Sequence, residues 1–197
     1  MNLAACEALG TKIVMEEDLA NVGPEGRVLL LMRHANSPWG GRGVRDFERE
    51  LSSRGHMDSA RVGRWLANSG RVPDHVVCSP ARRARETVAD VLKELGSPLS
   101  DVRWAEGIYE ASPSDLIDVL SQTPERAHCV LMVGHNPGME MLAGLFARGS
   151  GFAAGVQPSF STASVAHLTF EGDWDSVHEA GCELVTMMRP KDLPLDG

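Results

Sequence analysis

The sequence predicts an α/β protein, a three-layer α/β/α sandwich around a mostly parallel central sheet. Two observations favour this class: short apolar runs of strand length alternate with segments of helical spacing, and the runs are continuously apolar. Continuous apolar strands are typical of parallel sheets covered on both faces. At 197 residues the chain is long enough for one such domain with a full core. Ligands of these folds bind at the carboxyl ends of the strands.

The first half of the chain is predicted to contain a leader, two strands and two helices. We read residues 1–26 as a variable leader and 27–197 as the domain. Serines 52 and 53 are suited to cap a helix, and Gly96 is suited to end one. The expected elements are a strand at 28–32, a loop at 36–44, a helix from 51 to 66, a strand at 75–78 and an amphipathic helix at 84–95.

The second half continues the alternation. Ser112, followed by Pro113 and Asp115, is a favourable helix start. The expected elements are an edge strand at 102–104, a helix with its buried stripe at 116–120, a strand at 129–133, a helix after Pro137, and strands at 164–170 and 182–188.

Composition excludes several classes of function. The net charge of −8 and the pI of about 5.3 argue against a nucleic-acid or membrane-surface binder, which would need a basic face. The four cysteines are far apart and form no C-x-x-C pair, so neither a zinc site nor a disulfide framework is indicated. We find neither a signal peptide nor a membrane span, and we therefore expect a cytoplasmic protein.

Three predicted strands are each followed directly by cationic or imidazole side chains. Since the carboxyl ends of parallel strands lie at one edge of a sheet, we expect these groups to converge. A single histidine after a strand is usually structural, but three convergent groups are much less expected by chance. The groups are Arg33 with His34, Ser79 with Arg82 and Arg83, and Gly134 with His135.

The chemistry of this set points to phosphate. The planar arginine fork matches phosphate oxygens two at a time and stays charged at neutral pH. Histidine, with a pKa of about 6.5, has a neutral ring nitrogen that can attack phosphorus and form a covalent intermediate. His135 stands where a helix is predicted to begin and is suited to donate to a phosphate oxygen.

Three motifs in this order resemble those of the histidine phosphatase superfamily, whose fold is phosphoglycerate mutase-like. They are Arg33-His34-Ala35, the S-x-x-x-R-A-x-x-T segment at 79–87, and the G-H-x-P segment at 134–137. The similarity spans roughly residues 27–190. Within the superfamily, the short chain, the R-x-L-[ST]-x-x-G segment at 49–55 and the late 190–193 segment most resemble SixA-type phosphohistidine phosphatases.

The resemblance implies roles for five residues. His34 would be the nucleophile, Arg33 and Arg83 the phosphate clamps, His135 the second imidazole and Arg49 a third clamp. Arg82 competes with Arg83, but Arg83 has the spacing that the motif requires. Glu50 stands where the family usually has proline, which bears on the geometry of Arg49.

The general acid is a separate question. Many superfamily enzymes have a glutamate at this point of the chain, and Glu106, three residues before Tyr109, resembles it. Glu110 is the alternative, and a solvated surface carboxylate is the competing interpretation of both. A phosphohistidine substrate has an imidazole leaving group, so a strong protein acid is dispensable.

The sequence therefore predicts a metal-independent phosphatase without cofactors that acts on phosphohistidine in a partner protein. A phosphatase or mutase for small phosphate esters uses the same residues, but mutases usually carry larger insertions around the substrate. A phosphate-binding module without turnover is the third reading, and the presence of His34 argues against it. The oligomeric state is not predicted.

Overall fold

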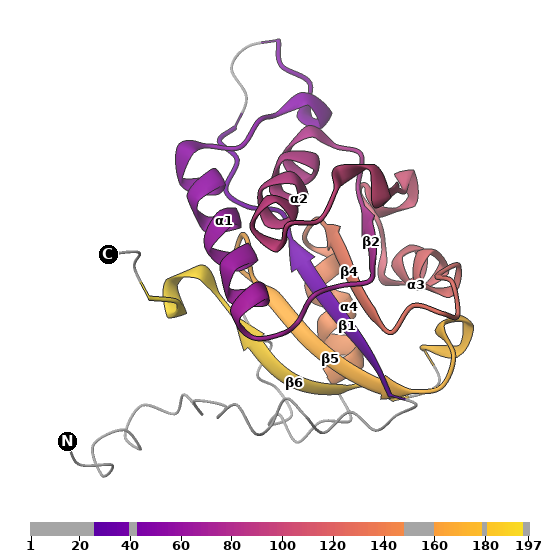
Figure 1. Ribbon diagram of the computed structural model, residues 1–197. Helices are drawn as coiled ribbons and strands as arrows, with labels where there is room; N and C mark the ends of the chain where they lie inside the picture. The colour runs from indigo at the N-terminus through magenta and orange to yellow at the C-terminus, as the bar shows by residue number, and fades with distance from the viewer. Residues whose placement is uncertain (1–25, 40–42, 148–159, 179–180, 195–197) are drawn as a thin grey trace, which may run out of the picture.

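The computed structural model describes residues 26–39, 43–147, 160–178 and 181–194 (Figure 1). Within these ranges six strands form one sheet. They are β1 (Gly26–Arg33), β2 (His75–Cys78), β3 (Val102–Trp104), β4 (Cys129–Gly134), β5 (Val165–Glu171) and β6 (Glu183–Met188). The predicted leader lies almost wholly outside the described residues, so the division at residue 26 stays a prediction.

The sheet is mostly parallel, as predicted. Its strand order is β3-β2-β4-β1-β5-β6, and β1 to β4 all run in the same direction. The later strands pair antiparallel, β5 with β1 and β6 with β5, so β5 alone is reversed. β1 lies between β4 and β5 and is paired along both edges.

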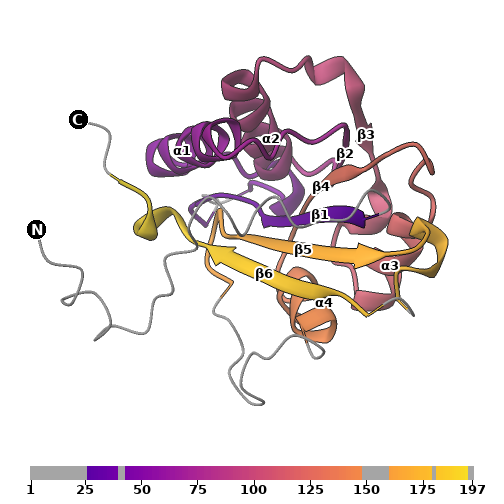
Figure 2. The same ribbon diagram turned by 60° about the horizontal axis from the view of Figure 1, so that its bottom comes forward.

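Helices cover both faces of the sheet, which gives the predicted three layers (Figure 2). α1 (Ser53–Asn68) and α2 (Arg82–Leu95) lie on one face, and α3 (Pro113–Ser121) and α4 (Gly138–Phe146) lie on the other. In β1, Leu30 and Met32 pack toward α1 and α2, whereas Leu29 and Leu31 pack toward α3 and α4. All four side chains are fully buried, which explains why the strand is apolar without alternation.

The helix ends follow the predicted capping residues. The Ser52 side chain accepts a hydrogen bond from the Gly55 amide at the start of α1. Gly96 ends α2 in the left-handed conformation, with φ of +68°. Ser112 and Asp115 form a capping box with proline in the first turn of α3. No helix of the described ranges has the length and apolarity needed to cross a bilayer.

The loop after β1 is held against the first turn of α1. The Asn36 carbonyl accepts the Ser52 amide at 2.9 Å, and a Cβ at Gly55 would lie 2.2 Å from the Asn36 oxygen. This contact is possible only with glycine at position 55. It fixes the backbone two residues beyond His34.

Replacing Gly55 with Ala should therefore destabilise the fold by roughly 2 kcal/mol, because the new methyl group meets backbone that cannot move away. Urea unfolding measures the change. Gly144→Ala in α4 is the matched control: its Cβ meets nothing within 4 Å, and its stability should be unchanged or about 1 kcal/mol higher. Equal stability of the two variants would contradict this account of the loop.

Candidate active site

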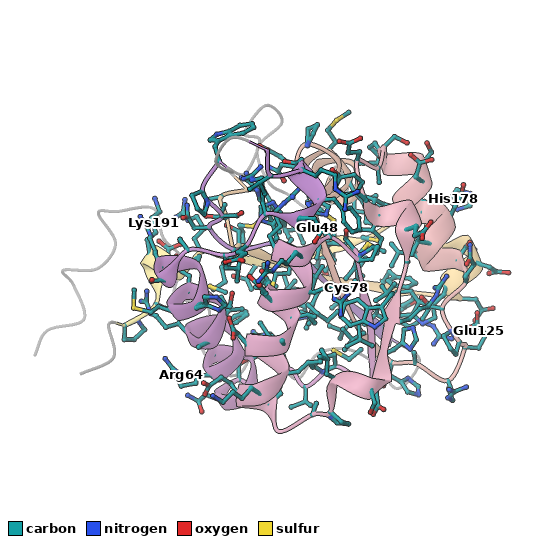
Figure 3. All side chains as sticks on the ribbon, turned by 90° about the horizontal axis from the view of Figure 1, so that it is seen from above. Glu48, Arg64, Cys78, Glu125, His178 and Lys191 are labelled. Carbon is teal, nitrogen blue, oxygen red and sulfur yellow. The ribbon has the colours of Figure 1, made fainter. Side chains whose placement is uncertain are left out.

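The three groups predicted to converge do meet at the carboxyl ends of adjacent strands. His34 follows β1, His135 follows β4 and Ser79 follows β2, and these strands are neighbours in the order β2-β4-β1. Figure 3 views the molecule from this end, with Cys78, the last residue of β2, near the centre. The His34 and His135 ring centroids are 5.0 Å apart.

The His34 ring is fixed through both of its nitrogens. Nδ1 lies 2.8 Å from the Ala35 carbonyl oxygen, and Nε2 lies 3.2 Å from Arg83 Nε. A carbonyl only accepts and an arginine nitrogen only donates, so Nδ1 carries the proton and Nε2 carries the lone pair. The backbone is held as well, because the His34 amide donates to the Gly134 carbonyl at 2.9 Å. Nε2 is therefore the nitrogen available to attack.

The environment keeps His34 neutral. Burial lowers the pKa of His34 to about 4, and the charges of Arg83, Arg33 and Arg49 act in the same direction against the Ala35 hydrogen bond. The ring is thus unprotonated at neutral pH, which a nucleophile requires.

One ring nitrogen of His135 has no hydrogen-bond partner. Its Nε2 lies 2.7 Å from Ser79 Oγ, which also accepts the Ala81 amide at 3.3 Å. The other ring nitrogen of His135, Nδ1, is buried and has no hydrogen-bond partner, and it donates to an anion when it carries the ring proton. Burial, followed by the nearby His34 and Arg83, lowers the pKa of His135 to about 3. A neutral imidazole with an unused N–H is suited to bind an anion.

Two arginines flank His34 as predicted. Arg33 donates from Nη1 to the Phe160 carbonyl at 2.8 Å, and its Nε is buried without a partner. Arg83 is 6% exposed and holds His34 with Nε, while Nη1 and Nη2 contact the carbonyl and carboxylate of Asp46 at 2.7 and 3.0 Å. Arg33 and His135 thus each keep a buried nitrogen without a partner, and such nitrogens are suited to bind the oxygens of a phosphoryl group.

Arg49 lies beside this pair. Its guanidinium donates to the Ser37 and Pro38 carbonyls at 2.9 and 3.0 Å and pairs with Asp46 at 2.7 Å. These contacts hold Arg49 in place without the proline that the family usually has at position 50.

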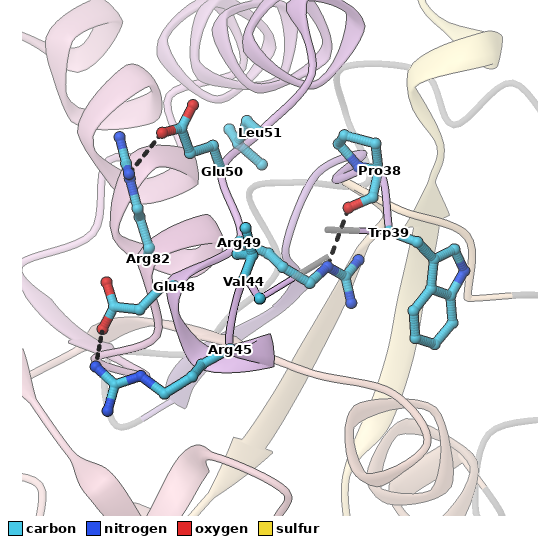
Figure 4. Close-up of a pocket in the computed structure, with 10 residues that line it drawn as sticks. Pro38, Trp39, Val44, Arg45, Glu48, Arg49, Glu50, Leu51 and Arg82 are labelled. Atoms are coloured by element: carbon cyan, nitrogen blue, oxygen red, sulfur yellow. Dashed lines mark hydrogen bonds and ion pairs between the residues drawn. The ribbon is translucent and has the colours of Figure 1, made fainter. Parts of the chain in front are cut away.

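The structure also separates Arg83 from its competitor. The Arg82 side chain is 46% exposed and pairs with Glu50 at 2.6 Å and Glu86 at 2.8 Å. Glu50 therefore holds Arg82 on the outside of α2 (Figure 4), while Arg83 points to His34.

The two glutamates proposed as acids are exposed. Glu106 begins a 3-10 helix after β3, and Glu110 follows it with φ of +54°. Among the contacts of the described residues, none joins either carboxylate to His34, Arg33, Arg83 or His135. The structure does not bring Glu106 into the cluster, and its assignment as general acid stays a prediction.

Sequence reasoning missed Asp46 and Tyr109. The Tyr109 ring stands edge-on to His135, with centroids 5.4 Å apart, and its hydroxyl donates to Asp46 at 2.9 Å. Asp46 lies in a short 3-10 helix and Tyr109 directly follows another, and neither segment has a periodic sequence pattern. No pattern in the sequence therefore indicated a role for either residue.

A pocket of about 480 Å³ lies beside Arg49 and Arg82 (Figure 4), and neither His34, His135, Arg33 nor Arg83 lines it. It is lined by polar and apolar groups, among them Trp39, Val44, Arg49 and Arg82. Trp39 is 88% exposed and lies against the Arg49 guanidinium, 4.8 Å from ring centroid to Cζ. The described residues include no group of three or more His, Cys, Asp or Glu placed to hold a metal ion.

The chain is similar in sequence to proteins of a known family. Residues 29–113 match the profile of the histidine phosphatase superfamily (branch 1). An uncharacterised protein of Mycobacterium tuberculosis is 35% identical over 155 residues, covering 77% of this chain and 94% of that protein.

Solved structures show the same fold. A structure from Nakamurella multipartitia, provisionally named phosphohistidine phosphatase SixA, is 31% identical to this chain, with a TM-score of 0.72 over 84% of this chain and 96% of that chain. The protein histidine phosphatase SixA bound to tungstate shares the fold, with a TM-score of 0.70 at 22% identity over 84% of this chain and 98% of that chain.

The buried histidines make stability depend on pH. The pKa values of His34, His135 and His167 are lowered from 6.5 to about 4, 3 and 4. Below pH 6.5 the unfolded chain binds protons that the folded chain does not, so stability falls as pH falls. At pH 5.5 we expect a loss of roughly 1 kcal/mol per histidine relative to pH 7.5.

Urea unfolding at the two pH values measures this loss. Asp46 does not affect this comparison. Its pKa is lowered to about 2, so the stability that it contributes is lost only as the pH falls below its unfolded pKa of 3.8. His167→Gln should reduce the pH-dependent loss by the contribution of one histidine, roughly 1 kcal/mol. Stability that is equal at pH 7.5 and 5.5 would rule out neutral buried imidazoles.

Proposed function

Because the chain belongs to the histidine phosphatase superfamily, we propose that it hydrolyses phosphohistidine in a partner protein through a covalent intermediate on His34. The observation that carries this proposal is the state of the His34 ring. Its Nδ1 donates to the Ala35 carbonyl, which leaves the lone pair on Nε2, the nitrogen that faces Arg83. A neutral, fixed imidazole is the activated form of this nucleophile.

In the first proposed step, His34 Nε2 forms a bond to phosphorus as the bond from phosphorus to the substrate nitrogen breaks. The leaving imidazole departs with a proton on its ring. Arg33, Arg83 and the Nδ1–H of His135 hold the phosphoryl oxygens as charge redistributes over them. In the second step, water attacks phosphorus, releases orthophosphate and restores His34.

We choose phosphohistidine as the substrate because of the similarity to a named relative and because of the exposed surface beside the histidine cluster. A protein that is 31% identical carries the provisional name of phosphohistidine phosphatase SixA. The exposed Trp39 and the pocket lined by Arg49 and Arg82 lie next to the histidine cluster, where they suit contacts with a protein that presents the phosphorylated side chain. A small ester would lack those outer contacts. We also propose a cytoplasmic location, since the composition indicates no other compartment.

A turnover screen tests the substrate class. We expect measurable hydrolysis of a phosphohistidine peptide and poor kcat/KM on sugar phosphates and phosphoglycerates. His34→Ala should abolish turnover of every substrate, whereas His56→Gln, which changes an exposed histidine paired with Asp90, should retain it. A several-hundred-fold preference for a small phosphate ester would favour the metabolic-phosphatase alternative.

We propose that turnover needs no metal ion, because Arg33, Arg83 and Arg49 supply the positive charge that a divalent cation would supply. Activity should therefore survive dialysis against a chelator. The assay compares the dialysed protein with samples to which magnesium or zinc is returned. Loss of activity that either metal restores would overturn this part of the proposal.

A further inference from the structure

Asp46 places a carboxylate between two arginines of the site, Arg49 and Arg83. Its Oδ1 pairs with Arg49 Nη1 at 2.7 Å, and its Oδ2 lies 3.0 Å from Arg83 Nη2 and 2.9 Å from the Tyr109 hydroxyl. A carboxylate has about four acceptor positions, and these contacts use three of them. A position on Oδ1 remains for a further donor.

This carboxylate lies on the solvent side of the nucleophile. Arg83 spans the two groups, with Nε on His34 and Nη2 on Asp46. Tyr109 makes a second connection, because its ring contacts the His135 ring edge-on and its hydroxyl donates to Asp46. The Asp46 side chain is 43% exposed, whereas His34 is 9% exposed. Attacking and leaving atoms lie in line across phosphorus, so a leaving group opposite the buried His34 departs toward solvent, where the Asp46 carboxylate is exposed.

Asp46 is an acceptor and not an acid. Burial alone would raise its pKa, but hydrogen bonds from Arg49 and Tyr109 and the charge of Arg83 hold the pKa at about 2. The group therefore stays ionised at neutral pH. It attracts a leaving group that carries an N–H and repels one that carries a negative charge.

Resting on the function proposed above, we infer that Asp46 selects the leaving group: it binds the phosphohistidine whose ring is protonated and cationic, and its carboxylate accepts the N–H at the ring nitrogen not bonded to phosphorus. When the P–N bond breaks, its electron pair stays on the departing nitrogen, and the proton on the other nitrogen makes the product a neutral imidazole. Without that proton the product would be an imidazolate, which is a far poorer leaving group. Asp46 keeps the proton in place.

The test compares two substrates that differ in the leaving group. In Asp46→Asn the negative charge is lost, so kcat/KM for a phosphohistidine peptide should fall roughly ten- to hundredfold further than kcat/KM for p-nitrophenyl phosphate. The leaving p-nitrophenolate bears no N–H and is anionic, so it gains nothing from the carboxylate. Any disturbance of Arg83 or Arg49 lowers both values alike and cancels in the ratio.

Two controls isolate the effect. Glu48→Gln removes one negative charge from the same 3-10 helix, where Glu48 pairs only loosely with Arg45 at 3.8 Å, and it should leave the substrate ratio unchanged. Asp46→Ser serves as a second substitution and should shift the ratio in the same direction as Asp46→Asn. An equal fall for both substrates in the Asp46 variants would overturn this inference alone. Failure of the unaltered protein to hydrolyse the phosphohistidine peptide would overturn the proposed function as well.

Discussion

The site depends on one hydrogen bond, from His34 Nδ1 to the carbonyl of the next residue. It determines which nitrogen carries the proton and therefore which one keeps a lone pair. This hydrogen bond joins adjacent residues, but hydrogen bonds to residues far away in the sequence hold the backbone of both. The Ala35 amide donates to Thr87 Oγ1 in α2, and the His34 amide donates to Gly134 at the end of β4. The doubly paired β1 strand thus delivers a ring whose orientation is fixed before substrate binds.

The site gathers positive and neutral groups at the expense of local stability. Burial lowers the pKa of both imidazoles and of Arg33, and polar atoms of Arg33 and His135 remain buried without partners. Unmade hydrogen bonds of this kind each cost about 1–3 kcal/mol. A bound phosphoryl group supplies the missing acceptors. Asp46 already neutralises part of the charge of Arg83 and Arg49, which lets two arginines approach one another in an acidic protein.

The fold and the central residues were predictable because their signals are local. Apolar runs predicted β1, β2 and β4 within a few residues, and parallel pairing brings His34, Arg83 and His135 together without further information. Asp46 and the Phe160 carbonyl were not predictable, because only the folded chain brings them to Arg83 and Arg33. The choice of Arg83 over Arg82 as a phosphate-binding residue required the sequence motif. The structure explains this choice, because salt bridges with Glu50 and Glu86 hold the Arg82 side chain elsewhere.

The central claim is that Nε2 of His34 is the nucleophile, because Nδ1 is occupied by the Ala35 carbonyl. Phosphorus and nitrogen NMR of the trapped phosphoenzyme, with peptide mapping to locate the modified residue, tests it most directly. The account predicts a phosphoryl group on His34 bonded to Nε2. A phosphoryl group on Nδ1, on His135 or on any other residue would contradict it.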